Sequence, residues 1–83
     1  MDRNELLEKL SDFLKEAMVG SVPDVKPDDD LAEKVGLDSM GAVDFATLVE
    51  EEFELEQLSP EEISSIKTLN DAADLVLGKM ESQ

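Results

Sequence analysis

The apolar residues in the first part of the chain recur with the spacing of an α-helix. A single stripe collects Leu6, Leu7, Leu10, Phe13, Leu14, Ala17 and Met18. Asp2 is followed three residues later by Glu5, and such a pair caps the start of many helices. The pattern therefore predicts a first amphipathic helix that packs this stripe against a core.

A long connection follows the first helix. Gly20, with Pro23 and Pro27 after it, ends the helix and predicts a loop that reaches to about Leu37. A connection of this length in a small domain is usually functional, or it is held in place by apolar residues of its own. The apolar residues available for this are Val22, Val25, Leu31, Val35 and Leu37.

A second helix is predicted from Asp38 or Ser39 to about Phe53, because either of the first two residues can cap the free backbone amides. Its inward stripe consists of Ala42, Phe45, Ala46, Val49 and Phe53. Its other face mixes exposed apolar residues with carboxylates, at Met40, Val43, Asp44, Thr47, Glu50 and Glu51. The first face is thus expected to pack against the core, whereas the second is expected to remain exposed.

Two capping signatures mark the last part of the chain. The segment Ser59 to Glu62, with proline at the first helical position, predicts a short helix that ends near Ser65. Thr68 and Asp71 repeat the signature for a final helix, and residues 81–83 are expected to fray. The core side of this final helix is predicted to carry Leu69, Ala72, Ala73, Val76 and Met80.

No segment alternates with the period of a β-strand, so the pattern predicts an all-α fold. We expect a small four-helix bundle of three longer helices and one short helix, with residues 1–83 forming one domain. The apolar spacing is too regular for a disordered chain, although the composition is acidic and poor in aromatic residues.

Composition excludes several classes of protein. Without cysteine the chain forms neither disulfides nor thiolate metal clusters, and without histidine it lacks the commonest general base, so we expect no enzyme. Its net charge of −15 repels nucleic acid and anionic membranes and attracts basic protein surfaces. No apolar run approaches the length of a membrane span. We expect a cytoplasmic monomer with basic protein partners, no nucleic-acid ligand and no membrane insertion.

Three consecutive aspartates, Asp28, Asp29 and Asp30, resemble at first sight a calcium site. A calcium loop of the EF-hand type alternates its ligands, has a glycine in the middle and closes with a glutamate. The triplet has none of that spacing. We therefore predict a charged loop and no metal site.

The segment Val35 to Met40 is a glycine-containing turn that delivers Ser39 to the start of a helix. Unpaired amides and the helix dipole favour an anion there, such as a phosphodiester on the serine. The ordinary alternative is that Ser39 or Asp38 only caps the helix, which is the commoner role of these residue types. The local residues leave both interpretations open.

The wider pattern resembles the signature of acyl carrier proteins, usually written L-G-x-D-S-L, with an acidic helix that ends in E-E-x-F. Here it consists of residues 35–43 followed by Glu50, Glu51, Glu52 and Phe53, and the resemblance extends over roughly the whole chain. It implies a bundle of acyl-carrier type with a 4′-phosphopantetheine arm on Ser39. A magnesium-dependent phosphopantetheinyl transferase would take the arm from coenzyme A and contact Asp38. The arm's thiol would carry acyl groups as thioesters, and the carrier itself would catalyse nothing.

The resemblance also makes the outer face of the second helix the expected docking surface. Its partners would be the basic surfaces of acyl-transferring, condensing or acyl-modifying enzymes, bound transiently and with salt sensitivity. Exposed apolar residues flanked by charge of one sign favour such an interaction site over an ordinary solvated face. The predicted docking residues are Met40, Val43, Asp44, Thr47, Glu50 and Glu51.

Some residues depart from the fatty-acid pattern. Met40 and Val35 stand where leucine is usual, and Gly41 and Ala42 follow where a polar pair is common. Asp-Ser-Met-Gly also resembles polyketide and D-alanyl carriers.

We predict a stand-alone carrier for fatty-acid or polyketide biosynthesis. The alternatives are an aminoacyl or peptidyl carrier, including the D-alanyl type, and an acidic helical adaptor without covalent modification. A core that opens for an acyl chain and a closed core are both compatible with the small residues Ala42 and Ala46.

Overall fold

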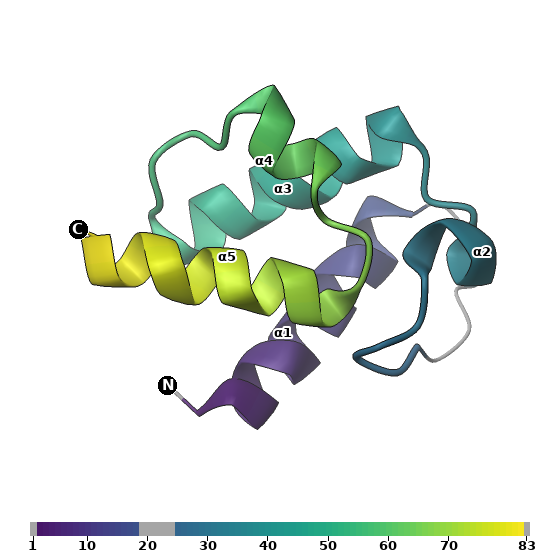
Figure 1. Ribbon diagram of the computed structural model, residues 1–83, viewed down its shortest axis with the longest axis horizontal. Helices are drawn as coiled ribbons and strands as arrows, with labels where there is room; N and C mark the ends of the chain where they lie inside the picture. The colour runs from purple at the N-terminus through teal and green to yellow at the C-terminus, as the bar shows by residue number, and fades with distance from the viewer. Residues whose placement is uncertain (1, 19–24, 83) are drawn as a thin grey trace.

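The structure, a computed structural model, describes residues 2–18 and 25–82 (Figure 1). Within those ranges the chain forms only helices, which confirms the all-α prediction. The helices are α1 (Arg3–Ala17), α2 (Leu31–Val35), α3 (Ser39–Phe53), α4 (Pro60–Ser64) and α5 (Leu69–Ser82). The fold is the predicted set of three longer helices and a short α4, with the additional short helix α2.

Helix α1 forms as the apolar stripe predicts. The carboxylate of Asp2 caps it by accepting a hydrogen bond from the amide of Asn4 at 3.4 Å, and Glu5 places a negative charge in the first turn. The helix ends at Ala17. The predicted stop signals at Gly20 and Pro23, and the apolar Val22, lie outside the described residues.

Helix α2 corrects the prediction of an uninterrupted loop to Leu37. Asp30 caps this helix, because its carboxylate accepts hydrogen bonds from the amides of Ala32 at 2.9 Å and Glu33 at 3.3 Å. Gly36 ends it with a left-handed backbone at φ +70°. A helix of five residues is too short to show a periodic apolar stripe, so only its two ends carried a signal.

The predicted apolar anchors of this connection are confirmed where they are described. Leu31 is fully buried, and Val25, Val35 and Leu37 pack partly buried against the core. The amide of Leu31 donates a hydrogen bond to the carbonyl of Lys67 at 2.9 Å, which ties the start of α2 to the connection before α5. The segment that leads to Ser39 is therefore held by packing and by the backbone.

Helix α1 packs against both α3 and α5, so the core lies between these three helices (Figure 1). Phe13 of α1 and Phe53 of α3 meet edge to face, with their ring centroids 5.8 Å apart. The buried apolar residues are Leu6, Leu10, Leu14, Leu31, Phe45, Ala46, Val49, Leu58, Ile66, Leu69, Ala72, Ala73 and Val76. Most of them belong to the predicted stripes.

The inward faces differ from the prediction at a few positions. On α3, Ala42 is only partly buried and Gly41 is buried, whereas Phe53 is partly buried and packs against the core as predicted. On α5, Met80 is 41% exposed, so its assignment to the core was wrong. The last turn of α5 also continues to Ser82, where a frayed tail was predicted, and Gln83 lies outside the described residues.

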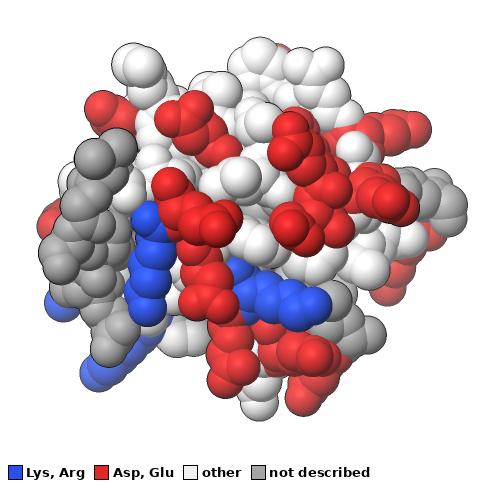
Figure 2. Space-filling model, turned by 180° about the vertical axis from the view of Figure 1, so that it is seen from behind, with Lys and Arg blue, Asp and Glu red and all other residues white. Residues whose placement is uncertain are grey.

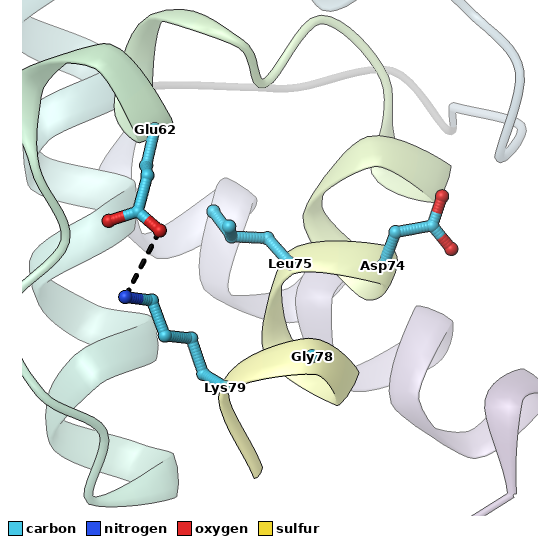
Figure 3. A pocket seen from close by; sticks show the side chains of 5 residues that line it. All are labelled: Glu62, Asp74, Leu75, Gly78 and Lys79. Atoms are coloured by element: carbon cyan, nitrogen blue, oxygen red, sulfur yellow. Dashed lines mark ion pairs between the residues drawn. The ribbon is translucent and has the colours of Figure 1, made fainter. Parts of the chain in front are cut away.

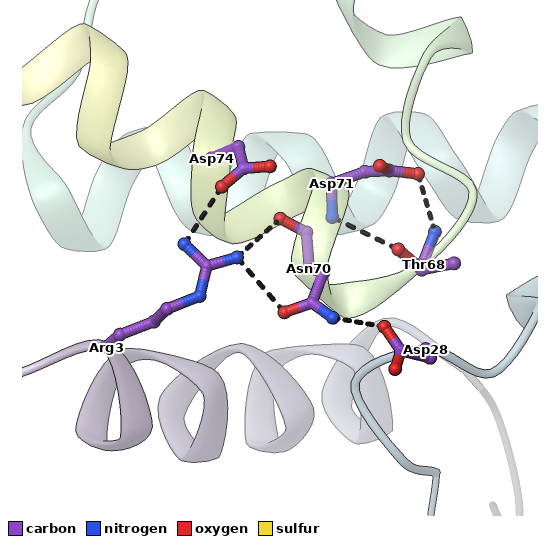
Figure 4. A network of polar contacts seen from close by, with 6 residues as sticks. All are labelled: Arg3, Asp28, Thr68, Asn70, Asp71 and Asp74. Carbon is purple, nitrogen blue, oxygen red and sulfur yellow. Dashed lines mark hydrogen bonds and ion pairs between the residues drawn. The ribbon is translucent and has the colours of Figure 1, made fainter.

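A polar network joins α1, α5 and the segment before α2 (Figure 4). The guanidinium of Arg3 pairs with Asp74 at 2.9 Å and donates to the side-chain oxygen of Asn70 at 3.0 Å. The side-chain amide of Asn70 donates to Asp28, and its backbone amide donates to the carbonyl of Pro27 at 3.1 Å. Asn70 thus bonds to three residues, and Arg3 joins a fourth. We call these five residues the Asn70 clasp: Arg3, Pro27, Asp28, Asn70 and Asp74.

The aspartate triplet has structural partners. Asp28 belongs to the Asn70 clasp, Asp29 accepts a hydrogen bond from the amide of Lys26 at 2.8 Å, and Asp30 caps α2. Over residues 2–18 and 25–82, no group of three or more histidine, cysteine or acidic side chains is arranged to hold a metal ion. The carboxylates of the triplet therefore organise the connection between α1 and α3.

The capping signatures of α4 and α5 form as predicted. Ser59 and Glu62 exchange side-chain to backbone hydrogen bonds at 2.9 and 3.1 Å, and Thr68 and Asp71 do so at 3.1 Å. Glu62 also pairs with Lys79 of α5 at 3.0 Å, across a hollow of about 260 Å³ (Figure 3). The backbone hydrogen bond from Ser59 and the contact with Lys79 lower the pKa of Glu62 from its ordinary value.

Candidate functional site

The start of α3 separates the role of Asp38 from that of Ser39. Asp38 is the N-cap, and its Oδ1 accepts a hydrogen bond from the amide of Gly41 at 2.8 Å. The carbonyl of Asp38 accepts another from the amide of Ala42 at 2.9 Å. Ser39 is the first residue of the helix and is exposed, and its hydroxyl has no hydrogen bond to any described residue. The cap is therefore Asp38, and among the described residues nothing engages the Ser39 hydroxyl.

Gly36 sets the direction in which the chain enters α3. Its amide bonds to carbonyls of α2, and the amide of Leu37 bonds to the carbonyl of Leu31 at 3.3 Å. An added Cβ at Gly36 would meet no atom within 4 Å, so space does not require glycine there. The left-handed φ of +70° does, because residues with a side chain rarely adopt it. The turn presents Asp38 and Ser39 immediately after a well-anchored helix.

Gly41 is a site residue that sequence reasoning missed. A Cβ at this position would lie 3.0 Å from Cδ1 of Leu37, 3.3 Å from Oδ1 of Asp38 and 3.5 Å from Sδ of Met18. The missing side chain lets Leu37 and the capping carboxylate pack closely over the first turn of α3. The available signal was the glycine itself, because glycine inside a helix costs about 1 kcal/mol relative to alanine and often has a packing reason.

The outer face of α3 displays most of the predicted docking residues. Met40 is 76% exposed and Val43 is 49% exposed, which makes them two of the three large exposed apolar residues in the described chain. Asp44, Thr47 and Glu51 are exposed as well. The Thr47 hydroxyl donates to the carbonyl of Val43 at 2.9 Å, as threonine often does within a helix.

Glu50 differs from its neighbours on this face. Its side chain is half-buried, and its Oε2 accepts a hydrogen bond from the backbone amide of Leu58. This contact holds the connection between α3 and α4 against the helix. The Glu50 carboxylate thus has an internal role that the sequence did not indicate.

Two shallow hollows lie on this side of the molecule. The first, of about 270 Å³, is lined by Ser39, Met40, Val43 and Asp44. The second, of about 360 Å³, lies between α1 and α3 and is lined by Glu16, Ala17, Asp44, Thr47, Leu48 and Glu51. Glu16 was not predicted to belong to this surface, because it lies on a helix that the sequence does not place beside α3.

The electrostatic character of the surface follows from the excess of acidic residues. Figure 2 shows carboxylates crowded over one face, with few basic side chains among them. Two basic residues are engaged internally, since Arg3 pairs with Asp74 and Lys79 pairs with Glu62. With a net charge of −15, the molecule attracts basic protein surfaces and repels anionic ones.

A family model described as "Phosphopantetheine attachment site" matches residues 4–76, which is most of the chain. The chain belongs to the acyl carrier protein family. The acyl carrier protein of Coprothermobacter proteolyticus is 32% identical over 76 residues, covering 92% of each chain. That of Thermosynechococcus vestitus is 30% identical over 80 residues, covering 96% of this chain and 98% of its own.

The fold of this acyl carrier protein agrees with a solved relative. A crystal structure of an acyl carrier protein from Thermotoga maritima matches it with a TM-score of 0.82 and 32% identity. The match covers 99% of this chain and 94% of the other. In the part of the chain that the structure describes, no helix combines the length and apolar character that crossing a membrane requires.

The prosthetic group that the family implies is 4′-phosphopantetheine. The start of α3 fits such a group, because an exposed serine hydroxyl, with no hydrogen bond to the described part of the chain, lies at the positive end of a helix. Asp38 already satisfies the Gly41 amide, so the helix does not need the serine as its cap.

Proposed function

We propose that this acyl carrier protein holds acyl groups on a 4′-phosphopantetheine arm attached to Oγ of Ser39. The observation that carries the proposal is the division of roles at the start of α3. Asp38 caps the helix through Gly41, while the adjacent serine hydroxyl is exposed and makes no hydrogen bond within residues 2–18 and 25–82. A phosphodiester at this position gains from the helix dipole.

The prosthetic group, when bound, supplies the thiol on which acyl groups are carried as thioesters. The chain has no cysteine, so it has no thiol of its own. The contribution of the protein is to hold Ser39 at a fixed helix terminus and to bring it to each partner enzyme. Tethering of this kind replaces a diffusive encounter with an intramolecular one and raises the effective concentration.

Asp38 is the residue that we propose the phosphopantetheinyl transferase contacts. Its side chain is exposed. One carboxylate oxygen, Oδ1, accepts from Gly41, and Oδ2 has no hydrogen bond to a described residue. The same carboxylate can therefore cap the helix and present its second oxygen to the transferase.

The outer face of α3 is the docking surface that we propose for pathway enzymes. Met40 and Val43 provide exposed apolar area, and Asp44 and Glu51 are exposed carboxylates beside them. We keep Thr47 and Glu50 in the surface, although the Glu50 carboxylate also bonds to Leu58. Partners would be acyl-transferring, condensing or acyl-modifying enzymes with basic surfaces.

We infer an acyl cargo of fatty-acid or polyketide type and a cytoplasmic location. The name that the two bacterial relatives carry supports acyl over aminoacyl or peptidyl cargo. The acidity of the chain supports basic enzyme partners. Intact-mass analysis of the protein isolated from its native host would identify the cargo directly, and an aminoacyl adduct would contradict this inference.

Attachment is tested by incubating the protein with coenzyme A, magnesium and a broad-specificity phosphopantetheinyl transferase. We expect intact mass to increase by one phosphopantetheine group. Ser39→Ala should abolish the increase, while Ser11→Ala on α1 should leave it unchanged. An unmodified wild-type protein, or an increase that survives Ser39→Ala, would overturn the proposal.

A further inference from the structure

The hollow next to Ser39 is lined mainly by apolar side chains, on the surface of a strongly acidic protein. Met40 and Val43 form most of it, and they are the two large apolar residues of α3 that are most exposed to water. Ser39 lines one part of the hollow and Asp44 supplies a carboxylate at another. Covering such area is favourable because it removes apolar surface from water.

We propose that this hollow seats the phosphopantetheine arm of the carrier between its encounters with partner enzymes. The inference rests on the proposed attachment at Ser39. A group anchored to the residue that lines the hollow experiences it at an effective concentration of about millimolar or more. A contact far too weak to hold a free ligand is therefore sufficient to keep a tethered one in place.

The chemistry of the arm fits the hollow. Its pantoate unit carries two geminal methyl groups, which are suited to contact with Met40 and Val43. Its amide N–H groups are donors, and the Asp44 carboxylate at the hollow is an acceptor without a hydrogen bond to any described residue. The many carboxylates of the surface attract no anionic ligand, so a largely neutral, tethered chain is a better occupant than a free anion.

The seat overlaps the docking surface at Met40 and Val43. A partner enzyme that covers these two side chains would displace the arm, and the arm would weaken the partner by the same factor. Docking and release of the arm would then be coupled through competition for one apolar patch. The arm would become free only where a partner is present to receive it.

The test uses holo protein labelled at the methionine methyl groups with ¹³C, with complete attachment confirmed by intact mass. We expect nuclear Overhauser contacts between the geminal methyls of the arm and the Met40 methyl, assigned by Met40→Leu. The Met80 methyl, on α5 and also exposed, is the internal reference and should show none. Val43→Ser should weaken or abolish the contacts, while Glu52→Gln on the same helix should preserve them.

The outcomes separate this inference from the proposed function. Full mass addition with no contact at Met40 would overturn the seat while leaving attachment at Ser39 intact. The same conclusion would follow if the arm methyls contacted core residues, or if the Met40 signal responded only to an added partner enzyme. Absence of the mass increase would overturn the attachment itself.

Discussion

The side of the molecule where α5 meets α1 and α4 contrasts with the outer face of α3. On the first side, charged and polar groups satisfy one another, in the Asn70 clasp and in the pair of Glu62 with Lys79. On the second, Asp44 and Glu51 are exposed beside the apolar Met40 and Val43. Engaged groups fix the fold, whereas exposed carboxylates without a hydrogen bond to a described residue remain available to other molecules. The contrast distinguishes the carboxylates that stabilise this acidic chain from those that we propose partner enzymes contact.

The largest effect on this contrast is expected from Asn70→Ala. The substitution removes the side-chain hydrogen bonds to Arg3 and Asp28 but leaves the backbone contact with Pro27. We expect a loss of about 1–2 kcal/mol in the free energy of unfolding, measured by urea titration, because both bonds are charge-assisted and partly exposed. Modification of Ser39 at a temperature where the variant is folded should be unchanged.

Asn4→Ala is the matched control for that substitution, since the Asn4 side chain is exposed and only its backbone amide bonds to Asp2. It should change stability by less than about 0.5 kcal/mol. If Asn70→Ala were equally neutral, the Asn70 clasp would not stabilise the fold. That result would contradict the stabilising role that we assign to the polar groups on the side of α5.

Substitutions at Asp38 should separate capping from recognition. Asp38→Ala removes the acceptor for the Gly41 amide and should cost about 1 kcal/mol, while Asp38→Asn preserves a good cap and should be nearly neutral. Both should slow the phosphopantetheinyl transferase, because neither retains the carboxylate charge. A full modification rate in Asp38→Asn would show that the transferase does not use that charge.

Charge reversal on the outer face of α3 should act on partners and not on the fold. Glu51→Lys should reduce turnover with a pathway enzyme about fivefold at low salt, the equivalent of ~1 kcal/mol, with helicity unchanged. Added salt should shrink the difference. Glu52→Lys, next to it on α3, makes the same change of charge outside the predicted surface, and an equal loss there would indicate a general effect of net charge.

The smallest effect concerns Glu62. Its pKa in the folded protein is lowered from the ordinary glutamate value, because the backbone hydrogen bond from Ser59 and the contact with Lys79 favour the charged form. Its contribution to stability is therefore present at pH values above the unfolded-state pKa and is lost as the pH falls through the folded-state pKa. Glu62→Gln should flatten this part of the acid unfolding curve, followed by circular dichroism. The exposed neighbour Glu61 provides the control, and an identical flattening in Glu61→Gln would contradict the assignment.

The sequence was sufficient for the three long helices and for α4, because each has an apolar stripe or a capping pair within a few residues. Helix α2 was not predicted, because its only signals were Asp30 at the start and Gly36 at the end. Met80 was placed in the core by periodicity, yet it lies 41% exposed near the end of α5, where a stripe can continue after the neighbouring helices have ended.

The candidate site was predictable in part. Motif and helix order pointed to Asp38, Ser39 and the outer face of α3, whereas the sequence could not decide which residue caps the helix. That decision depends on backbone geometry, with Asp38 extended and Ser39 already helical. The bond from Leu58 to Glu50 and the clasp between Arg3 and Asn70 join residues distant in sequence, so no local pattern reveals them.

The separation of cap and hydroxyl at the start of α3 has a consequence for the order of events in the life of the protein. Because Asp38 alone satisfies the Gly41 amide, the helix does not need a group on Ser39 in order to form. With the arm attached there as we propose, the chain can fold first and be modified later, and loss of the arm would not unravel the first turn. A Ser39→Ala protein would then keep its native surface and compete with the loaded form for every partner, as an inert decoy.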